Sequence, residues 1–225
     1  MFFIIFKQIS NIKYLKRKFE IFIRGVEIGD NTIPWIPIKA KIWLDKILDS
    51  DMILYEFGSG LSTLYFSPKV KKIISLEHDK EWYTTVQQEF FKKKIDNCEY
   101  YLIEPEKIEI EKSKGAKTGY KSKLRKYKNF HFKKYAHHID QFPNKYFDLI
   151  FIDGRVRITC IKNSIKKIKS GGYLVLDNSD EIEFKSVPRF LKSYKKQEFF
   201  GLAPMRPYLK YSKISFWKFT VWKIK

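Results

Sequence analysis

Most of this 225-residue chain is an alternation of two kinds of segment. Short, mostly apolar runs that are typical of strands alternate with segments whose apolar residues recur every three or four positions, as on one face of a helix. Strict alternation of strand and helix requires parallel strands joined by right-handed crossovers, so we predict an α/β fold with a doubly wound sheet. The predicted strands are 52–57, 72–76, 100–103, 147–152, 173–176, 198–202 and 214–221, and the predicted helices are 39–48, 61–67, 80–94, 135–141, 156–169 and 183–196. Gly171 and Gly172 are expected to cap the helix at 156–169.

Composition narrows the classes of function. Hydrophobic residues make up 44% of the chain, which is enough for a core and excludes a wholly disordered protein. The two cysteines, Cys98 and Cys160, exclude a disulfide-stapled mini-domain and a cysteine-rich zinc site; we interpret them as core residues and expect a cytoplasmic location. The net charge is +20, but arginine, the usual residue for bidentate contacts with phosphates and bases, supplies only 7 of the 45 basic groups. A nucleic-acid partner is therefore not favoured.

Residues 1–33 are predicted to be a basic helical extension in front of one domain that spans 34–225. Residues 1–24 carry six basic groups and one acidic group, with apolar residues at loosely helical spacing. We expect a helix that packs on its own domain or on a second subunit; the alternative is a helix lying on an anionic membrane surface. The longest apolar run, residues 1–6, is too short to span a bilayer.

A lysine-rich insertion is predicted at about 104–134. Its part from 112 to 134 holds ten basic residues and no acidic ones. We interpret it as a loop that is mobile when empty and adds little to the core. This cluster is the one feature that keeps a polyanionic substrate in consideration.

Ligands of doubly wound sheets bind beyond the carboxyl ends of the strands, so the residues after each strand are the candidates for a site. Glu56, Gly58 and Gly60 end the first predicted strand and begin the next loop. Glycines allow positive φ and close approach of a ligand to the backbone. The dinucleotide-binding spacing would place a third glycine at Thr63, and a carboxylate at Glu56 suits a cationic ligand better than a pyrophosphate.

Glu77 follows the second predicted strand and lies 17 residues after Gly60. A carboxylate at this place can accept both hydroxyls of an adenosine ribose. The alternative is a solvated acidic residue before a helix that Asp79 caps.

These segments resemble the successive motifs of class I S-adenosylmethionine-dependent methyltransferases, over residues from about 34 to 221. The matching segments are Glu56–Thr63, Leu76–Asp79, Phe147–Gly154 and Gly171–Asn178. The resemblance implies a Rossmann-like, mostly parallel, seven-stranded sheet with a C-terminal antiparallel hairpin, and S-adenosylmethionine as the cofactor. It also implies that Glu56, Gly58 and Gly60 line the methionine part with Ser62 and Thr63 nearby, that Glu77 holds the ribose, and that His78 lies near the adenine. Ser62 replaces the family's third loop glycine.

Asp153, Asp177 and Asn178 match in type and position the three magnesium ligands of catechol-type O-methyltransferases. Oxygen ligands of this kind suit a hard divalent cation, here Mg²⁺. The alternative starts from the pattern Asp-Gly-Arg-x-Arg at 153–157, which resembles a branch often found near surface-glycan genes. Asp153 then acts as a base or anchor, with Arg155 and Arg157 holding an anionic substrate. A third interpretation is that Asp177 and Asn178 only cap a turn.

The sequence thus predicts a methyltransferase that methylates a hydroxyl of a sugar, a glycan or another small polar acceptor, with Asp153 and Arg155 as catalytic residues. Two alternatives stay open. One is an RNA methyltransferase that uses the basic arm 112–134, and the other is a cofactor-binding module without turnover.

Overall fold

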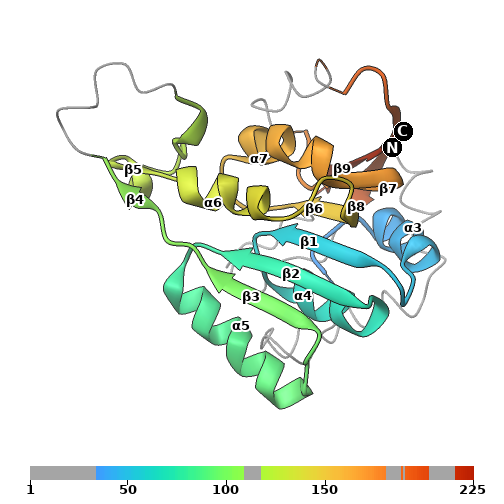
Figure 1. Cartoon of the computed structure of the whole chain (residues 1–225), viewed down its shortest axis with the longest axis horizontal. Helices are drawn as coiled ribbons and strands as arrows, with labels where there is room; N and C mark the ends of the chain where they lie inside the picture. Colours follow the sequence, from blue (N-terminus) through green and yellow to red (C-terminus); the bar gives the residue numbers. More distant parts are fainter. Residues whose placement is uncertain (1–33, 109–117, 181–188, 190, 203–215) are drawn as a thin grey trace.

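The computed structural model describes residues 34–108, 118–180, 189, 191–202 and 216–225, which form one seven-stranded sheet covered by helices on both faces (Figure 1). The strand order is β3-β2-β1-β6-β7-β9-β8. The first five strands in this order are parallel, and β9 runs antiparallel to both β7 and β8. The predicted sheet with a C-terminal hairpin is confirmed. The strands are β1 (Ile53–Phe57), β2 (Lys72–Glu77), β3 (Cys98–Leu102), β6 (Phe147–Ile152), β7 (Ile168–Leu176), β8 (Lys195–Leu202) and β9 (Phe216–Lys223).

The alternation of side chains along β1 divides the core into two layers. Tyr55 and Phe57 point to one face, where they pack with α6 (Lys133–His137) and α7 (Arg157–Ser164). Leu54 lies on the other face, with α3 (Ile38–Ile47) and α4 (Leu61–Phe66). The helix α5 (Lys80–Lys93) packs with α4 and β3 on the same side as α4. Because β2 and β6 flank β1 on opposite sides, the strand order reverses beside β1, and this is the point where such sheets bind ligands.

Two predicted helices differ from the structure. The helix expected over 156–169 ends at Ser164, a 3-10 turn covers Ile165–Lys167, and β7 begins at Ile168. Gly171 and Gly172 therefore lie inside a strand and cap no helix, because their backbone groups hydrogen-bond to Ile224 over 2.8 Å. Most of the helix expected over 183–196 lies outside the described residues, and Arg189 within it is helical. The predicted end of this helix is wrong, because residues 191–194 form a turn and β8 already begins at Lys195 to pair with β9.

The insertion also differs from the prediction. Its described part contains the two-stranded sheet β4 (Glu106–Lys107) and β5 (Phe130–His131), with 3-10 turns at Thr118–Tyr120 and Arg125–Tyr127. Phe132 is fully buried and Tyr127 is only 9% exposed. The hydroxyl of Tyr120 lies 2.7 Å from Nε2 of His137, which ties the insertion to α6. Residues 118–134 thus contribute to the core, and aromatic residues within a basic run were the signal for this.

We expect Phe132→Ala to lower the free energy of unfolding by about 3 kcal/mol, because it empties a fully buried site between the rings of Tyr127 and His78. Urea unfolding followed by circular dichroism measures this. Phe91→Ala is the control, since Phe91 on α5 is 79% exposed and its loss should change stability by less than about 0.5 kcal/mol. Equal stability of the two variants would mean that the insertion is not part of the core.

The residues 1–33, with the predicted basic helix, lie outside the described part of the chain. Among the described helices, none has the length and hydropathy needed to cross a membrane.

Candidate functional site

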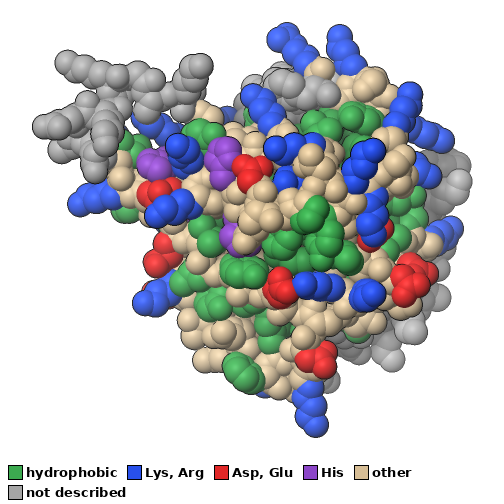
Figure 2. Space-filling model, in the orientation of Figure 1, with side chains coloured by type: hydrophobic (Ala, Val, Ile, Leu, Met, Phe, Trp, Pro, Cys, Tyr) green, Lys and Arg blue, Asp and Glu red, His purple; other side chains and the backbone are tan. Residues whose placement is uncertain are grey.

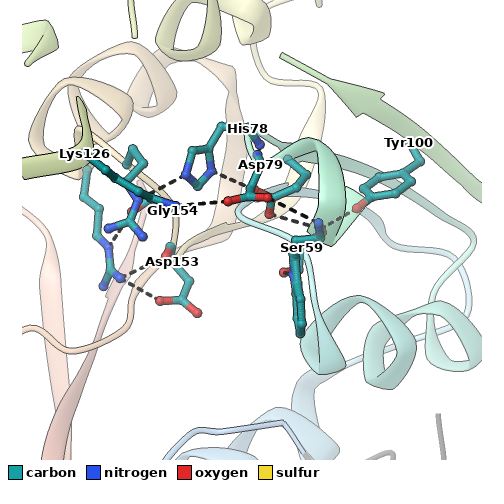
Figure 3. Close-up of polar contacts among 11 residues, drawn as sticks. Ser59, His78, Asp79, Tyr100, Lys126, Asp153 and Gly154 are labelled. Carbon is teal, nitrogen blue, oxygen red and sulfur yellow. Dashed lines mark hydrogen bonds and ion pairs between the residues drawn. The ribbon is translucent and has the colours of Figure 1, made fainter. Parts of the chain in front are cut away.

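The loops that follow β1, β2 and β6 meet at one edge of the sheet (Figure 3). The backbone N–H of Gly58 donates to the carbonyl oxygen of Leu76 over 2.9 Å, and the N–H of Asp153 donates to that of Phe57 over 2.9 Å. These two bonds extend the parallel pairing beyond the strands. They bring the glycine loop, Glu77 with His78, and Asp153 together at the reversal point of the strand order.

Gly58 and Gly154 are required by the packing of the protein itself. Gly58 has φ +91°, and a Cβ atom on it would lie 2.8 Å from both Cα and N of Gly154. A Cβ atom on Gly154 would lie 1.9 Å from the hydroxyl oxygen of Tyr135. Gly60 differs, because its Cβ atom would come no nearer than 3.6 Å, to the ring of Trp82. Internal packing therefore does not require a glycine at position 60. The sequence-based reason for a glycine, close approach of a ligand to the backbone, remains the explanation for Gly60.

Glu56 is fully buried below the glycine loop, and three hydroxyl groups donate to its carboxylate. The donors are Ser62 Oγ at 2.5 Å, Thr63 Oγ1 at 2.6 Å and Ser75 Oγ at 2.5 Å. This cluster connects α4 to β1 and β2. Burial raises the pKa of Glu56 to about 7, against the opposing effect of the three hydroxyl hydrogen bonds. The structure brings Glu56, Ser62 and Thr63 together through internal contacts, and their role toward a cofactor stays a prediction.

We expect the contribution of Glu56 to stability to fall as the pH rises from about 4.5 to about 7. The folded pKa lies above the ordinary value of 4.5, so the folded protein keeps a proton that the unfolded chain releases in this range. The full effect is on the order of 3 kcal/mol. The measurement is the difference in unfolding free energy between wild type and Glu56→Gln across this pH range, since other titrating groups cancel in it. A difference that does not change with pH would contradict the raised pKa.

Glu77 turns one carboxylate oxygen toward the backbone and the other toward the glycine loop. Its Oε1 accepts hydrogen bonds from the backbone N–H groups of His78 at 2.7 Å and Asp79 at 2.8 Å. Its Oε2 accepts one from Ser59 Oγ at 3.3 Å. Ser59 Oγ also lies 2.6 Å from the hydroxyl of Tyr100 (Figure 3). The carboxylate is thus only 3% exposed and held in one orientation beside the loop.

His78 is enclosed by the insertion. Its Nδ1 lies 2.7 Å from Oε1 of Glu77, and Nε of Arg155 donates to its Nε2 over 3.3 Å. The ring of Tyr127 packs on His78, and Nζ of Lys126 pairs with Asp79 at 3.1 Å (Figure 3).

Several residues at this edge were not predicted from the sequence. Besides Lys126 and Tyr127, they include Trp82, whose Nε1 donates to the carbonyl oxygen of Ser59 over 2.9 Å, and Tyr100. Trp82 and Tyr100 were expected only as a helix-face residue and a strand residue, because local periodicity does not show that they contact a loop far away in the sequence.

Asp153, Asp177 and Asn178 lie together around the guanidinium of Arg157. Its Nη2 lies 2.8 Å from Oδ1 of Asp153, and its Nη1 donates to the carbonyl oxygen of Asp177 at 2.7 Å and to Oδ1 of Asn178 at 3.4 Å. Asp177 is 2% exposed, and burial, with the charge of Asp153 as the second cause, raises its pKa well above the usual range. A positive side chain in contact with all three residues does not fit Mg²⁺. Within the described residues there is no group of three or more His, Cys, Asp or Glu that could hold a metal.

The same contacts correct one interpretation of the two arginines. Arg157 also donates to the carbonyl oxygens of Asp153 and Gly154, at 2.9 and 3.0 Å. Its guanidinium therefore connects the ends of β6 and β7 and is not directed at a substrate. Arg155, which contacts His78, remains the candidate for holding one.

No family model matches the sequence, and no curated protein matches it. Solved structures do. The O-methyltransferase from Bacillus cereus in complex with SAH has a TM-score of 0.58 and 12% identity, over 94% of this chain and 90% of that one. The tRNA (m1A58) methyltransferase from Aquifex aeolicus has a TM-score of 0.57 and 15% identity, over 92% and 75%. An rRNA methylase from Streptococcus thermophilus has a TM-score of 0.55 and 13% identity, over 83% and 95%. With its strand order and its hairpin, the chain has the fold of the class I S-adenosylmethionine-dependent methyltransferases.

Proposed function

We propose that this protein is an S-adenosylmethionine-dependent methyltransferase that acts on a hydroxyl group of a sugar, a glycan or another small polar molecule. The observation that carries the proposal is the meeting of the Gly58–Gly60 loop, the oriented carboxylate of Glu77 and Asp153 at the reversal point of the sheet. The similar structures described above, which are methyltransferases and include one in complex with SAH, support it.

The residues after β1 and β2 fit the proposed cofactor. Glu77 Oε2, next to the glycine loop, would accept hydrogen bonds from the ribose hydroxyls, and the missing side chain of Gly60 would let the ligand approach the backbone. His78 would lie next to the adenine, and Glu56 with Ser62 and Thr63 would keep the loop in place below the methionine part. S-adenosylmethionine, when bound, supplies a methyl group attached to a sulfonium cation.

The residues after β6 fit the acceptor. The side chain of Asp153 is 36% exposed, so it is open to a substrate while Arg157 holds one of its oxygens. We assign to Asp153 the removal of the acceptor's proton and to Arg155 the positioning of the acceptor. Positioning and proton removal are the main tasks in a direct methyl transfer.

A second candidate, an RNA methyltransferase, has one observation in its favour. In the described part of the insertion, Lys123, Arg125, Lys126, Lys128, Lys133 and Lys134 are exposed. On the face in Figure 2, however, lysine and arginine side chains are spread over the surface rather than gathered in one patch, which favours the small acceptor. Polynucleotide binding that weakens steeply with salt would support the RNA substrate instead.

The remaining assignments are proposals too. They are the boundary between residues 1–33 and the domain at 34–225, a cytoplasmic location, and contact of residues 1–24 with a membrane surface or a second subunit. A binding module that holds the cofactor without turnover is the third candidate. Tritiated S-adenosylmethionine incubated with cell extract, then fractionated into glycan, lipid, protein and RNA, separates all three functions.

We expect Glu77→Ala to weaken binding of S-adenosylmethionine by about 2–4 kcal/mol, roughly 30- to 700-fold, because the ribose loses charge-assisted hydrogen bonds. Titration calorimetry measures the affinity. Glu81→Ala is the matched control, since Glu81 is an exposed carboxylate four residues further on, in the first turn of α5. Unchanged affinity in a folded Glu77→Ala protein would exclude Glu77 as the ribose ligand.

A further inference from the structure

The ends of β6 and β7 are joined by one cation that belongs to the chain. The guanidinium of Arg157 contacts the carboxylate of Asp153, the side-chain oxygen of Asn178 and the carbonyl oxygens of Asp153, Gly154 and Asp177, at distances from 2.7 to 3.4 Å. Five oxygen atoms from two strand ends thus surround one positive group. The Arg157 side chain itself is only 13% exposed.

The chemistry of these oxygens is that of a hard-cation site. Carboxylate, amide and carbonyl oxygens are the ligands that Mg²⁺ and Mn²⁺ take in proteins. A guanidinium offers five N–H donors in a fixed plane, so it satisfies several such oxygens at once without a metal. Arg157 begins α7, and its place in the first turn of that helix directs the side chain back over the end of β6.

The guanidinium already pairs with the exposed carboxylate of this site. Nη2 of Arg157 lies 2.8 Å from Oδ1 of Asp153, whose side chain is 36% exposed, whereas Asp177 is buried. A divalent cation placed among the same oxygens would be repelled by the charge of Arg157.

We propose that Arg157 is a built-in replacement for a divalent cation: it neutralises and orients Asp153 and closes this strand-end site to metal ions. Arg157 is then a positioning residue. The view that Asp153 acts as a base rests on the proposed function, but the exclusion of metal ions does not, so each can fail without the other.

The test is a titration of the full chain with Mn²⁺. Electron paramagnetic resonance measures how much of the ion stays free. Wild type is expected to bind no Mn²⁺ at this site at millimolar concentration. Arg157→Gln, which keeps an amide donor but loses the charge, is expected to bind one Mn²⁺ at least about 100-fold more tightly than wild type. Adding Asp153→Asn to Arg157→Gln should abolish the gained site.

Two further variants serve as controls. Arg155→Gln removes the neighbouring arginine, which donates to His78, and should gain no Mn²⁺ site. Arg157→Lys keeps the charge and should exclude Mn²⁺ as wild type does. Circular dichroism checks that each variant is folded.

Mn²⁺ binding by wild type that disappears in Asp153→Asn would overturn the proposal, and this comparison needs no change at Arg157. A folded Arg157→Gln protein without an Asp153-dependent Mn²⁺ site would overturn it too. Cofactor binding by the same samples reports on the proposed function separately.

Discussion

Gly58→Val is expected to lower the free energy of unfolding by roughly 2–6 kcal/mol, a large part of the roughly 5–15 kcal/mol that stabilises a domain of this kind. Two costs add. A β-branched residue at φ +91° is strained by about 1–3 kcal/mol, and a Cβ atom 2.8 Å from the backbone of Gly154 forces two loops apart, at a further 1–3 kcal/mol or more. Urea unfolding measures the loss.

Gly60→Ala is the matched control, two residues further along the same loop. Gly60 has an extended backbone, and its nearest neighbour, the ring of Trp82, leaves ordinary van der Waals distance for a Cβ atom. We therefore expect this variant to fold as wild type does. A Gly58→Val protein as stable as wild type would show that the loops after β1 and β6 are not in contact.

Asp153→Asn is expected to reduce methyl transfer by roughly 10²–10⁴-fold, the usual effect of losing a general base. Asparagine has the shape of aspartate and keeps an oxygen for Arg157, but it does not take up the proton of an acceptor hydroxyl. The affinity for S-adenosylmethionine should stay within about twofold, because the carboxylate acts on the acceptor. The rate is measured as transfer of radiolabelled methyl to the accepting fraction of a cell extract.

Asp51→Asn is the control for this effect, since Asp51 is exposed at the opposite, amino end of β1. It should leave the rate unchanged. If Asp153→Asn transfers methyl groups at the wild-type rate, the base is another residue, and the proposed acceptor site at the end of β6 is wrong.

The central part of the fold could be predicted because its signals are local. The run Phe147–Ile152 is apolar except for Asp148 and forms the buried strand β6. The residues after β1, β2 and β6 meet as parallel topology requires. Glu77 and Asp153 could be selected as candidates for the same reason, since any polar residue directly after such a strand lies at the ligand-binding edge.

The errors arose where distant contacts decide the structure. The pattern at 156–169 is helical in period, but from Ile168 the chain pairs with β6 and later with β9, and strand pairing prevails over local period. The insertion was predicted to be a loop outside the core because of its many lysines. In the structure, Phe132 and Tyr127 bury their rings against His78. The pattern Asp-Gly-Arg-x-Arg does not show which arginine contacts the strand ends. Arg157 does so because α7 begins there and directs its side chain back over the end of β6.

The contact between Gly58 and Gly154 limits how a new acceptor preference can be evolved in the laboratory. The two backbones touch, and Tyr135 fills the space that a side chain on Gly154 would need. A library that randomises the loop after β6 must therefore hold position 154 fixed, or nearly all of its members will be lost to misfolding before selection begins. Diversity is better placed at Arg155 and at the exposed positions of the insertion, such as Lys123 and Lys128, where the chain tolerates changes of size and charge.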